Sequence, residues 1–410
     1  MLCFAFFLML GISQLYSQEE TSTETAREIT GLEVIGLKRT KDHIARYPLE
    51  RFIGRQADSL DTNEVTAVVK DTGILEPAGV ELIETEEGVI LRVTVQEKWT
   101  IIPFPLAMVS SGGNTFGLFL LDTNAFGLRD QAALGGMYGS TGWLAMALYN
   151  HTPNRRGQFG WNSSFMYSRR EQEDQDRDEK IHRRYTTDQL RFSFGLYYPF
   201  TNHLTVFGAA SFSKITLKDN NKTFNPPEDG AMLLGLIPGI SLRYSDWDGF
   251  LLSQQSLSLE YHYNFAISGS PYQQTEMKAI FEKSIIPGFR LALKSGSVWT
   301  SGSDPKYEEG PHAAQVDILP RSFSAKHYAG LSAGLEKHLF KTKMGTLSVL
   351  SSWQCVFSHG PISGDEFDNG PSGGIRFYLT RIALPAMGIT AAYNMNSGLV
   401  QFGFNLGMEF

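Results

Sequence analysis

The sequence predicts two parts: a small α+β module, followed by a transmembrane antiparallel β-barrel of about sixteen strands. Residues 29–98 mix helical and strand patterns within a short stretch. After residue 99 the helical pattern stops, and apolar and polar side chains alternate with period two. The connections between these segments alternate between short and long, as the two ends of a membrane barrel do.

The first residues predict export. Residues 2–12 form a nearly continuous apolar run, followed by Ser17 and a polar stretch. An apolar core of about ten residues that ends near a small residue is typical of a secretory signal peptide. A membrane-spanning helix needs about twenty apolar residues. We therefore expect residues 1–17 to be a signal peptide, although no Lys or Arg precedes the run, and residues 18–28 to be a polar linker.

The net charge and the cysteine content argue against nucleic-acid binding and against an internal disulfide. The net charge of −7 argues against nucleic-acid binding. The chain has two cysteines, and Cys3 lies in the predicted signal peptide. Cys355 would then have no partner in the mature chain, so we expect no internal disulfide and interpret Cys355 as a small apolar side chain in a strand.

The module at residues 29–98 is expected to have the order β-α-α-β-β. Residues 32–37 predict a first strand, and Thr40 is the expected N-cap of a first helix. A second helix is predicted from Thr62 to Asp71, where Gly73 and Pro77 end it. Residues 80–84 and 89–95 predict a hairpin.

Three properties favour a membrane barrel at residues 99–410 over a soluble β-sandwich, which would alternate in the same way. The predicted strands are about ten or more residues long, whereas strands in globular proteins average five or six. Aromatic residues gather near the strand ends. Short turns are expected at 121–124, 199–202, 285–288 and 384–387, and long polar loops at 169–184, 219–230, 301–327 and 359–372. An even strand count returns both barrel ends to the side of the module.

On these features the chain resembles the BamA-type outer-membrane assembly and translocation superfamily (the bacterial surface antigen family), whose periplasmic modules are called polypeptide-transport-associated (POTRA) domains. Residues 36–40 look like the end of the family's first strand and its helix entry, and residues 95–99 like the exit into the barrel. Residues 124–127 resemble the turn after barrel strand two, and residues 246–249 the acidic turn after strand eight. The resemblance implies a single POTRA domain and a location in the bacterial outer membrane, with the module in the periplasm.

The resemblance is most specific in the loop before strand twelve. The family carries an Arg-Gly-aromatic motif there that folds into the barrel lumen, and Arg321, Ser322 and Phe323 occupy that place. Period-two counting puts Glu336 on the inner face of strand twelve, opposite to Leu331 and Leu335. We expect Arg321 to pair with Glu336. Two departures weaken the match: Ser322 replaces the Gly, and Ser358 stands where the family has Asp.

No pattern in the sequence predicts catalysis. Residues 330–334 match G-x-S-x-G, but the motif lies inside a predicted strand instead of a strand-to-helix turn. Asp174, Asp176 and Asp178 sit two residues apart, faintly like a calcium loop, but neither the Gly nor the terminal bidentate Glu falls at the required position, and we interpret them as a solvated outer loop. We expect no catalytic residue, no metal, no cofactor and no enzyme activity.

The resemblance implies protein handling by strand pairing and lateral opening. The strand at 89–95, or the strand at its side, would offer an edge to an unfolded outer-membrane or secreted client. The barrel would open between its first strand, weakened by Pro103 and Pro105, and its last. Phe402, Phe404 and Phe410 would form the C-terminal signal for barrel assembly. Outer-membrane lipid and periplasmic accessory proteins are the further expected partners. A passive pore and a surface antigen or adhesin are the alternatives.

Overall fold

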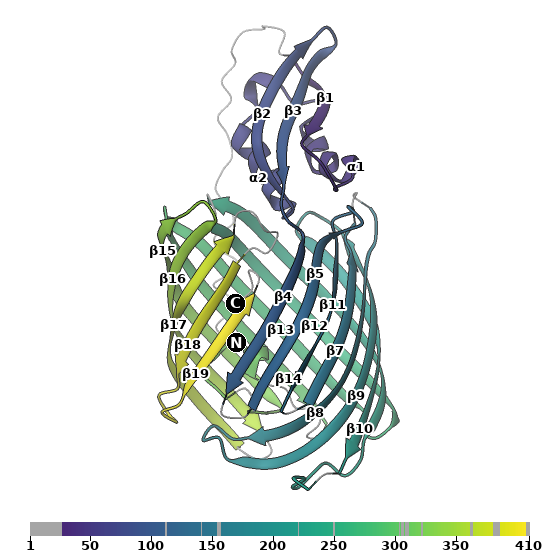
Figure 1. Ribbon diagram of the computed structural model, residues 1–410, viewed down its shortest axis with the longest axis vertical. Helices are drawn as coiled ribbons and strands as arrows, with labels where there is room; N and C mark the ends of the chain where they lie inside the picture. Colours follow the sequence, from purple (N-terminus) through teal and green to yellow (C-terminus); the bar gives the residue numbers. More distant parts are fainter. Residues whose placement is uncertain are drawn as a thin grey trace.

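The computed structural model describes residues 27–110, 113–140, 142–153, 157–219, 221–248, 251–302, 304, 307, 311–320, 323–360, 364–379 and 386–406. The predicted signal peptide lies outside these residues. Figure 1 shows a small α/β module above a large barrel of strongly tilted strands. No helix in the described part of the chain is long and apolar enough to cross a membrane.

The module has the predicted order of elements. Its helices and strands are β1 (Ile29–Ile35), α1 (Asp42–Arg46), the 3-10 helices η1 (Tyr47–Phe52) and η2 (Ala57–Ser59), α2 (Thr62–Asp71), β2 (Leu75–Thr85) and β3 (Gly88–Glu97). The sheet order is β1-β3-β2, with β1 parallel and β2 antiparallel to β3. The strand at residues 89–95 is therefore the centre of the sheet, and the prediction that named it as an edge is wrong. The other option, the strand at its side, is an edge.

Thr40 is not the N-cap of the first helix. Lys41 holds that position, without a side-chain hydrogen bond to the helix. Thr40 is buried and faces the barrel instead: its backbone N–H donates to Glu97, and its hydroxyl accepts a hydrogen bond from Asn124. The Thr40 side chain therefore contributes to the contact between the module and the barrel. In α2 the cap is Asp61, which accepts from the Asn63 N–H at 2.8 Å.

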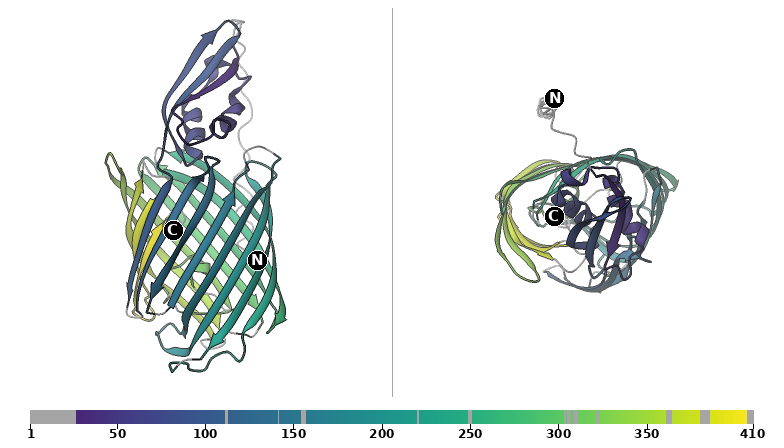
Figure 2. Two further views of the ribbon diagram at one scale, coloured as in Figure 1. Left: turned by 45° about the vertical axis from the view of Figure 1, so that its right-hand side comes forward. Right: turned by 90° about the horizontal axis from the view of Figure 1, so that it is seen from above.

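The barrel is a 16-stranded antiparallel sheet in which every strand pairs with its neighbours in sequence, so the predicted strand number is confirmed. Its strands are β4 (Ile101–Ser110), β5 (Gly113–Ala125), β6 (Asp130–Gly139), β7 (Gly142–His151), β8 (Gly160–Gln175), β9 (Ile181–Pro199), β10 (Leu204–Lys218), β11 (Ala231–Asp248), β12 (Leu251–Ser268), β13 (Tyr272–Ile286), β14 (Phe289–Ser301), β15 (His327–Lys341), β16 (Gly345–Gly360), β17 (Gly364–Leu379), β18 (Ala386–Tyr393) and β19 (Val400–Leu406). Seen from above in Figure 2, the module lies over one end of the barrel, which we call the module end.

Alternation along the strands gives the barrel an apolar outside and a polar inside. On β15, Leu331 and Leu335 are each 48% exposed on the outer face, whereas Glu336 is 3% exposed. The predicted facing of strand twelve is therefore confirmed, since β15 is the twelfth barrel strand. An outer face of large exposed apolar side chains is what a lipid-facing barrel wall requires.

Two of the expected long loops are mostly strand. β8 and β9 extend to Gln175 and from Ile181, and β16 and β17 extend to Gly360 and from Gly364. Charged residues continue the β8–β9 ladder because opposite charges face each other: Arg169 binds Asp188, and Arg183 binds Asp174. Residues 169–184 thus form a charged hairpin at the end of the barrel away from the module.

Candidate functional site

The segment between β14 and β15 packs against the inner wall of the barrel. It contains the 3-10 helix η4 (Pro311–Ala314). Its buried apolar side chains form a cluster with residues of β15, β16 and β18: Ala314, Val316, Ile318, Leu319, Phe323, Ala325, Tyr328, Val356 and Ala392. The backbone N–H of Asp317 donates to Gln354 Oε1 at 2.7 Å, which ties the segment to β16. We call residues 311–320 and 323–326 the lumenal segment.

Two glycines let the lumenal segment approach the wall closely. Gly296 on β14 and Gly330 on β15 are direct cross-strand partners. A Cβ atom on Gly296 would lie 2.4 Å from the carbonyl oxygen of Ala313, and one on Gly330 would lie 2.2 Å from that of Ala314. Only glycine at both positions leaves space for this backbone contact. Residues 330–334, which match the hydrolase motif, are therefore part of a strand against which a loop packs.

Phe323 is the one residue of the predicted motif that the structure describes. It is 1% exposed, its ring lies 6.1 Å from that of Tyr328, and its carbonyl oxygen accepts a hydrogen bond from the Tyr328 hydroxyl at 3.3 Å. It also forms a parallel bridge with Gln175, at the end of the charged β8–β9 hairpin. The lumenal segment and the hairpin therefore meet. Arg321 and Ser322 lie outside the described residues.

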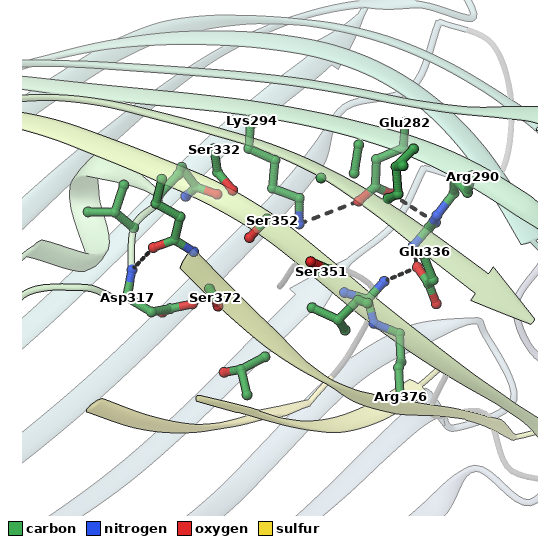
Figure 3. Close-up of a pocket in the computed structure, with 18 residues that line it drawn as sticks. Glu282, Arg290, Lys294, Asp317, Ser332, Glu336, Ser351, Ser352, Ser372 and Arg376 are labelled. Carbon is green, nitrogen blue, oxygen red and sulfur yellow. Dashed lines mark hydrogen bonds and ion pairs between the residues drawn. The ribbon is translucent and has the colours of Figure 1, made fainter. Parts of the chain in front are cut away.

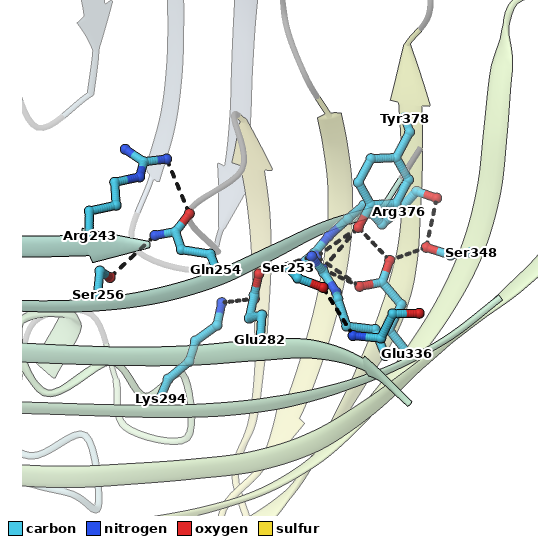
Figure 4. Close-up of polar contacts among 12 residues, drawn as sticks. Arg243, Ser253, Gln254, Ser256, Glu282, Lys294, Glu336, Ser348, Arg376 and Tyr378 are labelled. Carbon is cyan, nitrogen blue, oxygen red and sulfur yellow. Dashed lines mark hydrogen bonds and ion pairs between the residues drawn. The ribbon is translucent and has the colours of Figure 1, made fainter. Parts of the chain in front are cut away.

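Glu336 is the centre of a buried polar network that joins β14, β15, β16 and β17 (Figure 4). Arg290 and Arg376 both donate to Glu336 Oε2, the latter at 2.9 Å. Tyr378 donates to Oε1 at 2.7 Å, and the Ser348 hydroxyl donates to the same oxygen. The carboxylate therefore has four described donors. Its pairing with Arg321 stays a prediction.

The network continues to β13. Arg290 Nη1 donates to Glu282 Oε2 at 2.9 Å, and Lys294 Nζ lies 3.4 Å from Glu282 Oε1. Glu282, Arg290 and Glu336 are each no more than 4% exposed. Period-two counting could have placed each of these side chains inside the barrel. It could not have brought them together, because the partners lie on strands whose mutual register the sequence does not reveal.

One further group on the inner wall has the donors of a metal site. Glu260 and His262 on β12 and Glu276 on β13 place ligand atoms within 4.8 Å of one another. Lys278 Nζ already lies 2.5 Å from Glu276 Oε1. A cation would have to compete with the Lys278 ammonium group for Glu276. The group is therefore better described as a cluster whose negative charge is partly neutralised than as a set of metal ligands.

The module is joined to the barrel through the motifs that carry the family resemblance. Arg39 donates to both carboxylate oxygens of Asp122 on β5, at 3.1 and 2.5 Å, and to Thr100 Oγ1 at 2.7 Å. The Lys41 N–H donates to the carbonyl oxygen of Gly127 at 2.9 Å. The Asn124 side-chain amide also donates to Thr40 Oγ1 at 2.9 Å, so residues 36–40 and 124–127 contact each other across the joint.

A second arginine fixes the joint from the barrel side. Arg129, in the turn between β5 and β6, donates to the carbonyl oxygens of Asp71 and Thr72, each at 3.0 Å. These carbonyls lie at the C-terminal end of α2, where the helix dipole favours a positive charge. The module and the barrel therefore each contribute one arginine that binds the other part.

Glu97, the last residue of β3, orders the module side of this joint. Its carboxylate accepts from the Arg39 N–H at 2.9 Å and from the Thr40 N–H at 2.7 Å. Partial burial opposes ionisation of Glu97, but the hydrogen bonds from Thr40 and the neighbouring backbone outweigh it and hold the pKa of Glu97 below its usual range. The sequence marked these residues only through the resemblance.

The first and last barrel strands, β4 and β19, stand at the two ends of the strand order. Within the described residues each has one hydrogen-bonded strand neighbour, and Figures 1 and 2 show the two strands beside each other. We call this place the seam. Phe402 on β19 is 72% exposed, Phe404 belongs to the same strand, and Phe410 lies outside the described residues. Their role as an assembly signal stays a prediction.

Solved structures match this fold, although no protein-family model and no curated protein matches the sequence. BamA from Haemophilus ducreyi lacking POTRA domains 1–3 matches with a TM-score of 0.53 and 13% identity, over 92% of this chain and 84% of that chain. CdiB from Escherichia coli matches with a TM-score of 0.62 and 12% identity, and CdiB from Acinetobacter baumannii with 0.60 and 11%. Both cover 93% of this chain and 74% of the CdiB chains. The chain therefore has the fold of the BamA-type outer-membrane barrels, with one small α/β module before the barrel.

Proposed function

We propose that this protein is a bacterial outer-membrane barrel that inserts or translocates β-rich client proteins, without covalent chemistry. Its module would lie in the periplasm and receive an unfolded client. The client would then pass to the seam, where strand pairing and lateral opening release it into the membrane or across it.

The observation that carries this proposal is the seam. A barrel wall satisfies its backbone groups by pairing every strand on both sides. β4 and β19 each have one hydrogen-bonded neighbour among the described residues. Pro103 and Pro105 also remove two N–H donors from β4. A wall that is weakest between its first and last strands is suited to open there and to pair with a client strand.

The module offers one strand edge for the earlier step. β3 is central, and the outer side of β1 is partly covered, because Ile29 exchanges backbone hydrogen bonds with Gly54 and Arg55. β2 is the other edge of the sheet, and at Pro77–Gly79 its ladder to β3 is irregular. An extended client segment would pair with β2 through backbone hydrogen bonds.

The lumenal segment argues against the alternative of a passive pore. It fills space next to the inner wall and contacts the charged hairpin through Phe323. An open channel needs no such packed segment. A surface antigen or adhesin would work through its outer loops alone and would need neither the module nor the seam. Outer-membrane lipid and, beside the client, periplasmic accessory proteins are the partners that this function implies.

The test is reconstitution of the purified chain into liposomes, followed by the folding rate of a small unfolded outer-membrane protein added outside. Empty liposomes and the Arg321→Ala variant are the comparisons. We expect wild type to accelerate folding over empty liposomes, and the variant to lose a large part of this acceleration. No acceleration, together with steady ion conductance in planar bilayers, would contradict the proposal and favour the pore.

A further inference from the structure

Two carboxylates on β17, near the end of the barrel away from the module, each have a buried oxygen without a hydrogen-bond partner. Glu366 and Asp368 lie on either side of Phe367, which is 55% exposed, so both acidic side chains face the inside of the barrel. Asp368 is 0% exposed; Asn394 donates to its Oδ1 at 3.0 Å, and its Oδ2 has no partner among the described residues. Glu366 Oε1 lies 3.8 Å from Arg177 Nε of the charged β8–β9 hairpin, whereas its Oε2 likewise has no described partner. Two acceptor atoms are therefore left unused on one face of the strand.

No other buried carboxylate oxygen lacks a partner in the part of the chain that the structure describes. The network around Glu336 shows the usual arrangement, in which Arg376 donates to Glu336 and Lys294 Nζ lies 3.4 Å from Glu282 (Figure 3). An ionised carboxylate can only accept hydrogen bonds, and buried polar atoms nearly always have a partner. The two unused oxygens on β17 therefore indicate a partner outside the described residues.

A buried hydroxyl group lies beside these carboxylates. Ser358 on β16 is the direct cross-strand partner of Glu366. It is 0% exposed and its neighbour Phe357 is 39% exposed, so Ser358 also faces inside, where the Cβ atoms of opposite residues lie about 4.5–5.5 Å apart. The Ser358 hydroxyl has no partner among the described residues, so it does not donate to the adjacent carboxylate. Three buried oxygens, from Ser358, Glu366 and Asp368, thus occupy neighbouring positions on one face, and none has a described partner.

We infer that Glu366, Asp368 and Ser358 bind a calcium ion. Two carboxylates and a hydroxyl offer oxygen ligands only, which suit Ca²⁺ or Mg²⁺ and not the transition metals that prefer nitrogen or sulfur. Ca²⁺ is the better fit, because it accepts about six to eight oxygens in flexible geometry, whereas Mg²⁺ demands a near-ideal octahedron. The two strands fix the positions of these three side chains, and water would complete the shell.

Arg177 limits the affinity of this site. Its side chain is 35% exposed and lies beside the other Glu366 oxygen, so part of the negative charge is already neutralised. We expect a dissociation constant of about 0.1–1 mM, the range of extracellular Ca²⁺ modules. With the module in the periplasm, as the proposed function has it, the site would face the outside of the cell. The site goes beyond the handling of clients, and its test does not depend on client folding.

The test is isothermal titration calorimetry on the purified full chain in a non-ionic detergent, stripped of divalent cations with a chelator that is then removed. The probes are CaCl₂ and MgCl₂ at constant ionic strength. We expect saturable binding of one Ca²⁺ per chain, with Mg²⁺ at least about tenfold weaker. Absence of saturable Ca²⁺ binding, or Mg²⁺ binding of equal strength, would overturn the calcium site.

Two variants test the assigned ligands. Asp368→Asn removes one charged ligand, keeps the oxygen that accepts from Asn394, and is expected to weaken Ca²⁺ binding at least about tenfold. Ser358→Ala is expected to weaken it about threefold.

Thermal unfolding gives a second measure of the same site. Ca²⁺ should raise the unfolding midpoint of wild type but not that of Asp368→Asn. In the presence of a chelator, Asp368→Asn should be at least as stable as wild type, because it removes an uncompensated buried charge. A variant that is less stable without Ca²⁺, or that Ca²⁺ stabilises as much as wild type, would overturn the assignment.

Matched controls lie elsewhere on the inner wall. Both carboxylate oxygens of Asp188 on β9 accept from Arg169, at 2.6 and 2.8 Å. Thr346 is 0% exposed, also has a hydroxyl without a described partner, and lies at the module end of β16. Asp188→Asn and Thr346→Val should therefore bind Ca²⁺ like wild type. Affinity that is unchanged in Asp368→Asn, or lowered equally in the controls, would overturn the site.

Arg321→Ala separates a metal ion from a cationic side chain as the partner of the two carboxylates. We expect this variant to bind Ca²⁺ with the affinity of wild type. Calcium binding that appears only in Arg321→Ala would mean that the arginine takes the place of the ion, and would overturn the site.

Discussion

Glu336 shows how one buried charge organises a barrel wall. Its carboxylate accepts hydrogen bonds from Arg290, Arg376, Tyr378 and Ser348. These donors lie on β14, β16 and β17, so the carboxylate connects three strands besides its own. In a place that is 3% exposed, such a charge is stable only with its partners in position. The residue that the family resemblance singled out is therefore part of the structural support of the inner wall, whichever further contact it makes.

Replacing this carboxylate should cost much stability. Glu336→Gln removes the negative charge that Arg290 and Arg376 share. We expect the free energy of unfolding in micelles to fall by about 3 kcal/mol or more, because two buried guanidinium groups lose this counter-charge. Urea titration followed by tryptophan fluorescence measures it. The control is Glu276→Gln, whose side chain is 20% exposed and pairs with Lys278, with an expected loss of about 1 kcal/mol or less. Equal losses in the two variants would contradict the account.

The glycine contact behind the lumenal segment gives a second residue-level prediction. In Gly330→Ala the new methyl group would lie 2.2 Å from the Ala314 carbonyl oxygen, so the segment has to move. We expect a loss of about 1–3 kcal/mol and faster proteolytic cleavage within residues 311–326. Gly208→Ala is the control, because a Cβ there meets nothing within 4 Å. A lumenal segment that stays as protected as in wild type would refute this packing.

At the scale of elements, the joint between module and barrel is a reciprocal contact of two arginines. Arg39 reaches from the module to Asp122, and Arg129 reaches from the barrel to the end of α2. Such a joint restricts the tilt of the module, and the β2 edge is then held in one direction above the barrel.

Loss of the Arg39 contact should release the module. In a Cys355→Ser background, spin labels at residue 84 of the module and residue 222 of the barrel report their separation. We expect a narrow distance distribution for wild type and a broader one for Arg39→Met, because the bidentate contact to Asp122 is gone. Arg51→Met is the control, since this exposed arginine bonds only to the Pro48 carbonyl oxygen among the described contacts. A distribution that broadens equally in both variants would argue against a specific joint.

The joint should also loosen in acid. Because the pKa of Glu97 is lowered in the folded joint, its contribution is fully present above the pKa of an unfolded glutamate, about 4.3, and is lost as the pH falls through the lower folded value. The distance distribution should therefore stay narrow near neutral pH and broaden in acid. Glu97→Gln should be broad already at neutral pH. Broadening on the alkaline side instead would contradict the assigned role of the carboxylate.

The same elements show which features of the barrel the sequence could predict and which it could not. Alternation predicted the barrel, its strand number and the inward side of Glu336, because a wall between lipid and water forces period two on every strand. It misread residues 169–184 as a loop, since charged residues are common in loops and here face one another across a hairpin, as Arg169 and Asp188 do. It also could not find Arg290 and Arg376 as partners of Glu336. Their meeting depends on the register of four strands, which separate turns set.

The whole molecule combines a module fixed over one end, a lumenal segment packed on the inner wall, and a seam between the strands that begin and end the barrel. The apolar cluster and the charged network lie at different levels of the inner wall. The cluster that holds Phe323 lies towards the end away from the module, where Phe323 meets the β8–β9 hairpin, whereas the network of charges around Glu336 lies towards the module end. The seam is the part of the wall with the fewest described backbone hydrogen bonds, and the proposed function depends on its opening.

Locking the seam tests this claim most directly. In the Cys355→Ser background, cysteine pairs drawn from residues 101–105 of β4 and 402–406 of β19 would be screened for the pair that oxidises. A cysteine pair at Ala279 and Ser295, direct partners on β13 and β14, is the control, since it links strands that are already paired. In liposomes we predict that the oxidised seam pair abolishes acceleration of client folding, that reduction restores it, and that the control pair has no effect. Full acceleration with the seam locked would contradict lateral opening.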